Sequence, residues 1–283
     1  MSPQVSSRRG AQATRHAVLA LFAVLFAVPL YLAVVAATRS APAFLNGVPF
    51  TPGGQLGHNI SQVFGAGIAN SPPIGNLMVN SAVMALGVSL GKLVLSVPVA
   101  YAVVFFRFRG RLAAFWLVLA TLMLPVEVRF FPTYQVTSQL GMLNSYPGLI
   151  VPLVASATAV FFFRQSFKSF PLELADAARL DGIGPLGFLW RVVLPLSKPG
   201  LAAVFVLEFI YGWNQYLWPL LVTSGTHTTV VMGIREMISA AQSFAVPQWD
   251  LVMTVALLAL VPPVLVVLVM QRWFVRGLTA GIS

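Results

Sequence analysis

Six long apolar stretches limit what this chain can fold into. The sequence is 58% hydrophobic and only 8% charged, whereas soluble domains are typically about 25% charged. A helix of roughly 20 apolar residues crosses the hydrocarbon core of a bilayer. We therefore expect an all-α polytopic membrane protein with six transmembrane helices, at about 17–37, 77–106, 112–132, 147–164, 200–222 and 251–271.

The segments between these stretches predict one transmembrane domain and its orientation. No internal repeat and no linker divides the chain, so residues 17–283 are expected to form a single domain with a core at about 77–272, after an N-terminal tail at 1–16. Thirteen Lys and Arg residues fall on one side of the predicted spans and three on the other. The positive-inside rule then places both termini, and the loop 165–199, in the cytoplasm.

The first apolar stretch also has features of a secretory signal peptide, because three arginines precede it. Its apolar run of about 21 residues is longer than the 7–15 residues of a signal peptide. We expect a retained helix, with cleavage as the alternative. The net charge of +10 is spread between apolar blocks rather than gathered in one patch, so nucleic-acid binding is not expected.

Residues suited to catalysis or metal binding are scarce. The chain has no cysteine, and its three histidines, His16, His58 and His227, lie far apart. No metal motif or nucleophilic triad is present. The segment Gly87–Lys92 differs from a phosphate-binding loop in glycine spacing and in the residue that follows the lysine, so we expect no nucleotide site and no cofactor in this chain. A membrane enzyme is therefore disfavoured, and an ion-coupled carrier stays as an alternative although no repeat supports it.

The loop 165–199 holds three of the seven acidic residues of the chain. Asp176 and Arg179 are spaced i,i+3 and can pair on one helix face. Gly182 fits a helix C-cap, and prolines suit the start of a helix or its end. We predict a helix around Leu172–Leu180, a turn at Gly182, and a second helix that Pro185 opens and Pro195 stops.

This loop resembles the EAA loop of ABC importer permeases. Asp176-Ala177-Ala178 match its first three positions, Gly182 follows after three residues, and Val192, Leu194 and Pro195 complete the pattern, with Asp in place of the usual Glu. The resemblance implies that the loop docks in a cleft on a separate ATPase and passes its closure to the spanning helices. The residues expected to carry this coupling are Glu173, Asp176, Ala177, Ala178, Arg179, Asp181, Gly182 and Pro195.

The rest of the chain resembles the permeases of carbohydrate-type ABC importers. The segment 211–220 (YGWNQYLWPL) is typical of that class, and 123–129 (MLPVEVR), 132–134, 143–146, 155–159 and Gln215 resemble the second permease of sn-glycerol-3-phosphate importers. The resemblance implies a bacterial inner-membrane protein. Its expected partners are a sister permease, an ATPase homodimer that binds ATP and Mg²⁺, and an extracytoplasmic solute-binding protein. The expected solute is sn-glycerol-3-phosphate or a glycerophosphodiester such as glycerophosphocholine, with a neutral sugar or oligosaccharide as the alternative.

Ionisable and polar residues within spans are candidates for the solute path because their burial in lipid is costly. Arg129 could attract a phosphate, or anchor at the interface, or pair with the sister subunit. Lys92 could pair with Glu208, contact an anion, or extend to the interface. The expected path residues are Arg129, Trp213, Asn214, Gln215 and Lys92, although Asn and Gln also bond across helices. Trp218, Trp249 and Trp273 are expected at the membrane interfaces.

Overall fold

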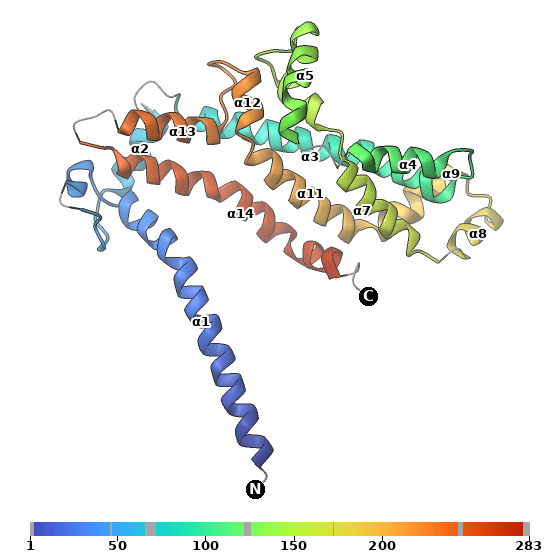
Figure 1. Cartoon of the computed structure of the whole chain (residues 1–283), viewed down its shortest axis with the longest axis horizontal. Coiled ribbons are helices and arrows are strands. Elements are labelled where there is room, and N and C mark those ends of the chain that lie inside the picture. The colour runs from blue at the N-terminus through green and yellow to red at the C-terminus, as the bar shows by residue number, and fades with distance from the viewer. Residues whose placement is uncertain are drawn as a thin grey trace. The chain divides into compact units, whose positions relative to one another are not determined.

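The computed structural model describes residues 3–45, 47–65, 72–121, 126–171, 173–242 and 246–279. Within these ranges the regular elements are helices, and no strand occurs among them (Figure 1). The expected all-α class is therefore confirmed. The backbone divides into two compact units, one made of residues 1–74 and 234–260, the other of residues 75–233 and 261–283.

The first unit begins with α1 (Pro3–Ala37), whose side chains from Thr14 to Leu30 are exposed within the chain and mostly apolar. The helix α2 (Leu56–Gly65) is hydrogen-bonded to the C-terminal end of α1. The buried Asn59 side chain donates hydrogen bonds to the carbonyls of Ala37 and Arg39, at 2.9 and 2.8 Å. Ala37 is the last residue of α1 and Arg39 lies two residues beyond it, so one asparagine binds carbonyls that lack an intrahelical partner and fixes the turn after α1.

The second unit is organised on α3 (Ile74–Phe105), whose apolar residues lie on all sides of the helix, as expected for a spanning helix. Small residues let its neighbours approach closely. A Cβ added at Gly87 would lie 2.6 Å from the Ile150 side chain, and one at Gly91 would lie 2.5 Å from Val154. Gly87 and Gly91 are spaced i,i+4 and form a packing surface of the kind common between membrane helices.

The helix α11 (Lys198–Trp213) meets α3 at another small residue. A Cβ on Gly212 would lie 2.9 Å from the Cα of Ala85, so the two backbones are in contact there. The other helices of this unit are α4 (Arg111–Ala120), α5 (Val126–Gln139), α6 (Tyr146–Ile150), α7 (Ala157–Lys168), α8 (Glu173–Leu180), α9 (Pro185–Phe188), α10 (Leu194–Leu196) and α12 (Leu217–Val222).

Two further helices have residues in both units. They are α13 (Val230–Ala241) and α14 (Trp249–Thr279). The first turn of α13 is bound to α3, because the Val230 amide donates to the buried Ser81 hydroxyl at 2.7 Å. The α14 helix continues through Pro262 and Pro263, which spanning helices tolerate when neighbouring groups satisfy the freed carbonyls.

Three described helices are long and apolar enough to span a bilayer: Thr14–Ala37, Ile74–Phe105 and Trp249–Trp273. They coincide with the first, second and sixth predicted stretches. Two bent pairs add candidates, namely Tyr146–Leu153 with Ala157–Lys168, bent by 49°, and Pro185–Leu196 with Lys198–Trp213, bent by 75°. The described residues thus hold up to five spans, and the count of six stays a prediction.

The fifth predicted span, 200–222, is wrong as a single helix. The α11 helix ends at Trp213, and a new helix, α12, begins at Leu217. The third predicted span, 112–132, is also not one described helix, because α4 ends at Ala120 and residues 122–125 lie outside the described part. A hydropathy window averages over such breaks and therefore does not detect them.

Candidate functional site

A cavity of about 740 Å³ lies within the second unit, between α3, α7 and α11. Its walls are largely apolar, with side chains such as Leu95, Val99 and Leu207. Polar and charged groups are few. They come from Lys92, Ser96, Thr121, Arg129, Ser156, Thr158, Glu208 and Tyr211. A mostly apolar pocket with a few convergent polar groups is the usual form of a small-molecule site.

An ion pair between α3 and α11 forms part of the cavity wall. The Lys92 ammonium lies 2.6 Å from the Glu208 carboxylate, and the two side chains are 7% and 12% exposed. The ammonium also lies 3.8 Å from the ring centre of Tyr211, where the face of the aromatic ring attracts a cation. The pairing of Lys92 with Glu208, one of three expectations for Lys92, is confirmed.

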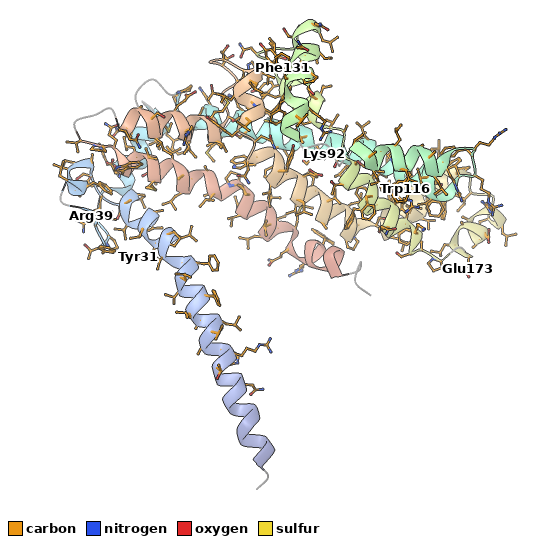
Figure 2. All side chains as sticks on the ribbon, viewed as in Figure 1. Tyr31, Arg39, Lys92, Trp116, Phe131 and Glu173 are labelled. Atoms are coloured by element: carbon orange, nitrogen blue, oxygen red, sulfur yellow. The ribbon has the colours of Figure 1, made fainter. Side chains whose placement is uncertain are left out.

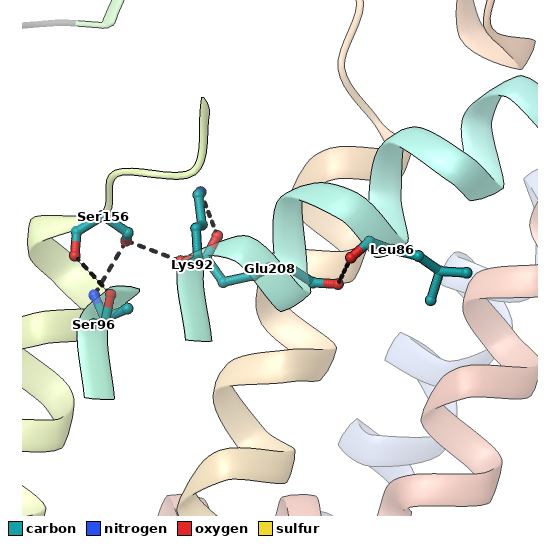
Figure 3. A network of polar contacts seen from close by, with 7 residues as sticks. Leu86, Lys92, Ser96, Ser156 and Glu208 are labelled. Carbon is teal, nitrogen blue, oxygen red and sulfur yellow. Dashed lines mark hydrogen bonds and ion pairs between the residues drawn. The ribbon is translucent and has the colours of Figure 1, made fainter. Parts of the chain in front are cut away.

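The same carboxylate connects to α7 (Figure 3). Its second oxygen accepts a hydrogen bond from the Ser156 hydroxyl at 3.1 Å, and the Ser96 hydroxyl donates to the Ser156 carbonyl at 3.4 Å. Ser156 is also the N-cap of α7, since its hydroxyl accepts from the Ala159 amide at 3.2 Å. Ser156 therefore both caps the N-terminus of α7 and donates a hydrogen bond to the carboxylate of the ion pair.

Arg129 lies on α5 and its side chain is exposed at the cavity. Among the side chains that the structure describes, the ion pairs are Lys92–Glu208 and Asp176–Arg179, so no described carboxylate balances Arg129. The Glu127 side chain lies outside the described residues. Among the lining residues that the structure describes there are therefore two cations and one carboxylate, a positive balance.

The loop 165–199 has the predicted order of helix, turn and helix. The α8 helix runs over Glu173–Leu180, and Leu172, the predicted first residue, lies outside the described part. Arg179 pairs with Asp176 at 3.0 Å, as the i,i+3 spacing predicted, although both side chains are about 70% exposed and such pairs contribute little stability. Glu173, at the start of the helix, is also exposed (Figure 2).

Gly182 ends α8 in the left-handed conformation, with φ +71°. Its amide donates to the Arg179 carbonyl at 3.0 Å, and the next amide, of Ile183, donates to the Ala178 carbonyl at 2.8 Å. These two bonds are the Schellman motif, which commonly ends helices at a glycine. The predicted cap is confirmed.

An aromatic cluster anchors the loop to the spanning helices. Ala178 of α8 is buried against a core that includes Tyr101, Phe163, Phe167 and Phe188. The Tyr101 hydroxyl on α3 donates to the Pro185 carbonyl at 2.7 Å, at the point where the second loop helix begins. Ala178 of α8 thus packs in the same cluster as Tyr101 of α3, and one hydrogen bond joins the end of α3 to the start of α9.

Pro195 does not stop the second loop helix. The helical stretch from Pro185 continues through a π-helical turn, Leu189–Val193, and ends at Leu196. The chain bends by 75° between Leu196 and Lys198. Pro195 lies inside this stretch, directly after the π-helical turn, so the helix ends after the proline rather than at it.

Comparison with known proteins identifies the family. The profile of the binding-protein-dependent transport system inner membrane components matches residues 92–280. The chain belongs to this family. It is 53% identical to the sn-glycerol-3-phosphate transport system permease protein UgpE of Yersinia enterocolitica, over 97% of this chain and 98% of that protein. The corresponding proteins of Pectobacterium atrosepticum and Salmonella typhi are 50% and 49% identical, with the same coverage.

Among solved structures, the permease is similar to a chain from the crystal structure of a bacterial ABC transporter involved in the import of the acidic polysaccharide alginate. The TM-score is 0.81 at 22% identity, over 97% of this chain and 99% of that one. At this identity the similarity shows the fold alone. The permease is accordingly a multi-pass inner-membrane transport subunit with an ABC importer permease fold.

The five predicted path residues of the permease do not lie together. Lys92 and Arg129 line the cavity, whereas Trp213, Asn214 and Gln215 are not among its lining residues. Trp213 is buried and stacks on Phe209 with ring centres 5.9 Å apart, and Asn214 is the C-cap of α11. Whether the solute contacts these three residues stays a prediction.

Other residues of the permease differ from expectation. Trp218 is fully buried and its indole donates to the Gly148 carbonyl at 3.2 Å, so it is a packing residue rather than part of an exposed aromatic belt; its depth in the membrane stays a prediction. Ser96, Ser156 and Tyr211 line the cavity but were not among the predicted path residues. The sequence contains a signal for Ser156 as the start of a helix, because a serine that precedes an apolar helix is a typical N-cap.

Proposed function

We propose that this permease moves sn-glycerol-3-phosphate or glycerophosphodiesters across the inner membrane as part of an ATP-driven importer. The observation that carries the proposal is identity of about half over nearly the full length of curated sn-glycerol-3-phosphate permeases from several bacteria. Transport through a polytopic chain depends on many dispersed contacts, so full-length similarity supports a shared solute class better than a short motif does.

We infer that the permease works with three other components. A sister permease completes the pathway, a binding protein delivers the solute, and an ATPase homodimer that binds ATP and Mg²⁺ drives the cycle. The permease has no nucleotide site of its own in this proposal. Docking of α8 on the ATPase passes closure to α3 through Ala178 and the Tyr101–Pro185 hydrogen bond, as a rigid-body change between two states. The family is incompatible with an ion-coupled carrier that works alone.

Reconstitution tests this assignment. The complete importer in proteoliposomes should take up radiolabelled sn-glycerol-3-phosphate only with ATP inside and binding protein outside. The permease alone should neither hydrolyse ATP nor move solute. Uptake by the isolated permease would contradict the proposal, and uptake of neutral sugars but not of glycerol phosphates by the complete importer would favour the alternative solute class.

We also propose six spans with both termini in the cytoplasm, so that the loop 165–199 faces the ATPase. The sequence has no cysteine, so a single introduced cysteine is a unique label. Ser166→Cys in the loop should react with a membrane-impermeant maleimide only after the membrane is opened, whereas Ser224→Cys, after α12, should react in intact spheroplasts. The reverse pattern would invert the topology.

A further inference from the structure

We propose that the cavity between α3, α7 and α11 is an anion site that holds the phosphate group of the solute. Arg129, Lys92 and the N-terminus of α7 would bind the phosphate oxygens, and Glu208 would be the counter-ion of Lys92 when no solute is present. This inference rests on the proposed function for the choice of solute, but its evidence is the charge and geometry of the cavity.

The first argument is the charge of the lining. Glu208 neutralises Lys92 across 2.6 Å, which leaves the exposed Arg129 guanidinium as an additional positive charge among the described lining residues. Guanidinium binds phosphate in a bidentate manner with strong, charge-assisted hydrogen bonds. A cavity for a neutral sugar has no need of this charge, whereas a phosphate ester compensates it.

The second argument is the helix break beside the ion pair. The predicted fourth span is bent by 49° between Leu153 and Ala157, and α7 restarts there with twelve residues. The first amides of a helix have no intrahelical acceptor, and they carry a partial positive charge. Ala157 and Thr158, which supply two of these amides, line the cavity. Broken membrane helices that point their N-termini at an anionic solute group recur in transporters.

The third argument is how Lys92 is held. A buried ammonium without a partner is strongly unfavourable, so the empty site needs a carboxylate. Glu208 supplies it, and Ser156 donates a second hydrogen bond to that carboxylate from the N-cap of α7. A phosphate that reaches Lys92 would share the ammonium with Glu208, which keeps its hydrogen bond from Ser156, so that no buried carboxylate is left unpaired. This change of partners would alter the contacts that join α3, α7 and α11.

The rest of the lining fits a small polar ester. The volume of about 740 Å³ is within the range for small-molecule sites. Thr121, Thr158 and Ser96 place hydroxyl groups on walls that are otherwise apolar. The Ser96 and Thr121 hydroxyls already donate to carbonyls of the chain, so they can accept hydrogen bonds from the hydroxyls of a glycerol unit.

The test compares two solutes in the complete importer with its binding protein in proteoliposomes. sn-Glycerol-3-phosphate carries a phosphomonoester and glycerophosphocholine a phosphodiester with a lower charge. Arg129→Gln should lower kcat/KM for uptake of the monoester by about 10- to 100-fold, the loss expected for a charged hydrogen bond, and should lower that of the diester less. Arg15→Gln, a change of the same type on α1, should leave both unchanged. Equal effects of Arg129→Gln on the two solutes would overturn the role of Arg129.

A double variant separates binding by Lys92 from a structural role. Lys92→Met with Glu208→Gln removes both charges, and a neutral pair of similar volume is often tolerated in a buried position. If the pair only stabilises the fold, the double variant should restore uptake that Lys92→Met alone abolishes. We expect it to restore thermal stability but to leave monoester uptake at least about 10-fold below the wild type. Restored monoester uptake would refute the anion site, whereas failure of the wild-type importer to transport any glycerol phosphate would refute the proposed function instead.

Discussion

Gly182 offers a sharp test of the coupling loop, because its conformation is one that other residues rarely adopt. It closes α8 at φ +71°, and two hydrogen bonds of the Schellman motif depend on that conformation. Replacing it with alanine, or more strongly with valine, should shift the loop away from the capped form. Asparagine tolerates the left-handed region and should preserve it.

The structure sets the expected size of the effect. A Cβ at Gly182 would have no heavy atom within 4 Å in this chain, so no steric clash contributes. Backbone strain remains, at about 1–2 kcal/mol for a non-glycine residue. That free energy changes the ratio of capped to uncapped loop by about 5- to 30-fold. An isolated helix as short as the eight residues of α8 is not stable alone, so the cap and the packing of Ala178 decide its position.

The assay is the initial rate of ATP-driven, binding-protein-dependent uptake by the complete importer, normalised to the amount of assembled complex. We expect the order wild type, Gly182→Asn, Gly182→Ala and Gly182→Val, from fastest to slowest, with a several-fold loss for alanine. Gly184→Ala is the matched control, since Gly184 has φ −66° and a Cβ added there would also have no heavy atom within 4 Å. It should transport at the wild-type rate.

Two results would refute this reasoning. If Gly182→Asn is slower than Gly182→Ala, side-chain size rather than backbone conformation limits transport, and the loop fails by contact with another subunit. If Gly182→Val transports like the wild type, the left-handed cap is not needed for coupling. If Gly184→Ala slows transport as much as Gly182→Ala does, backbone conformation at Gly182 is again not what limits transport.

Three further predictions concern stability, measured as the thermal unfolding midpoint of the permease complex in detergent. Lys92→Met alone should destabilise the folded permease by about 3–5 kcal/mol, because Glu208 is left as an unpaired buried charge. Adding Glu208→Gln should recover most of that loss, and a double variant as unstable as the single one would contradict this. Gly212→Leu should cost about 1–3 kcal/mol by forcing α11 away from α3, whereas Gly200→Ala, whose added Cβ would lie 3.3 Å from a movable phenylalanine ring, should cost less. Trp218→Phe should cost about 1–3 kcal/mol because a buried carbonyl of α6 loses its donor, and an unchanged midpoint would show that the indole hydrogen bond is not needed.

Some features could be predicted from the sequence because they depend on residues close together in the chain. The class of protein follows from apolar runs, since a helix of sufficient length must find an apolar solvent. The order of helix, turn and helix in the loop follows from i,i+3 pairing at Asp176 and Arg179 and from the backbone freedom of Gly182. Each of these interactions spans only a few residues, and its energy depends little on the rest of the fold.

The cavity could only be partly predicted. Lys92 and Glu208 were recognised as costly charges in apolar segments, but three roles for Lys92 were equally compatible with the sequence. The two residues are 116 positions apart, and their contact depends on the rotation of α3 and α11 about their own axes. Gly212 and Ala85 set that rotation by backbone contact, and hydropathy contains no information about it.

The positions of the helix breaks at Ser156 and Asn214 also depend on tertiary structure. The chain is apolar on both sides of Ser156 and of Asn214, so periodicity predicts uninterrupted spans there. The breaks persist because side chains and neighbouring helices satisfy the freed backbone groups, as the Ser156 hydroxyl does for the Ala159 amide. Sequence determined that this chain lies in a membrane and carries a charged helix–turn–helix loop at 165–199. Packing between distant helices decided where its charges meet, because that meeting depends on contacts that no local pattern encodes.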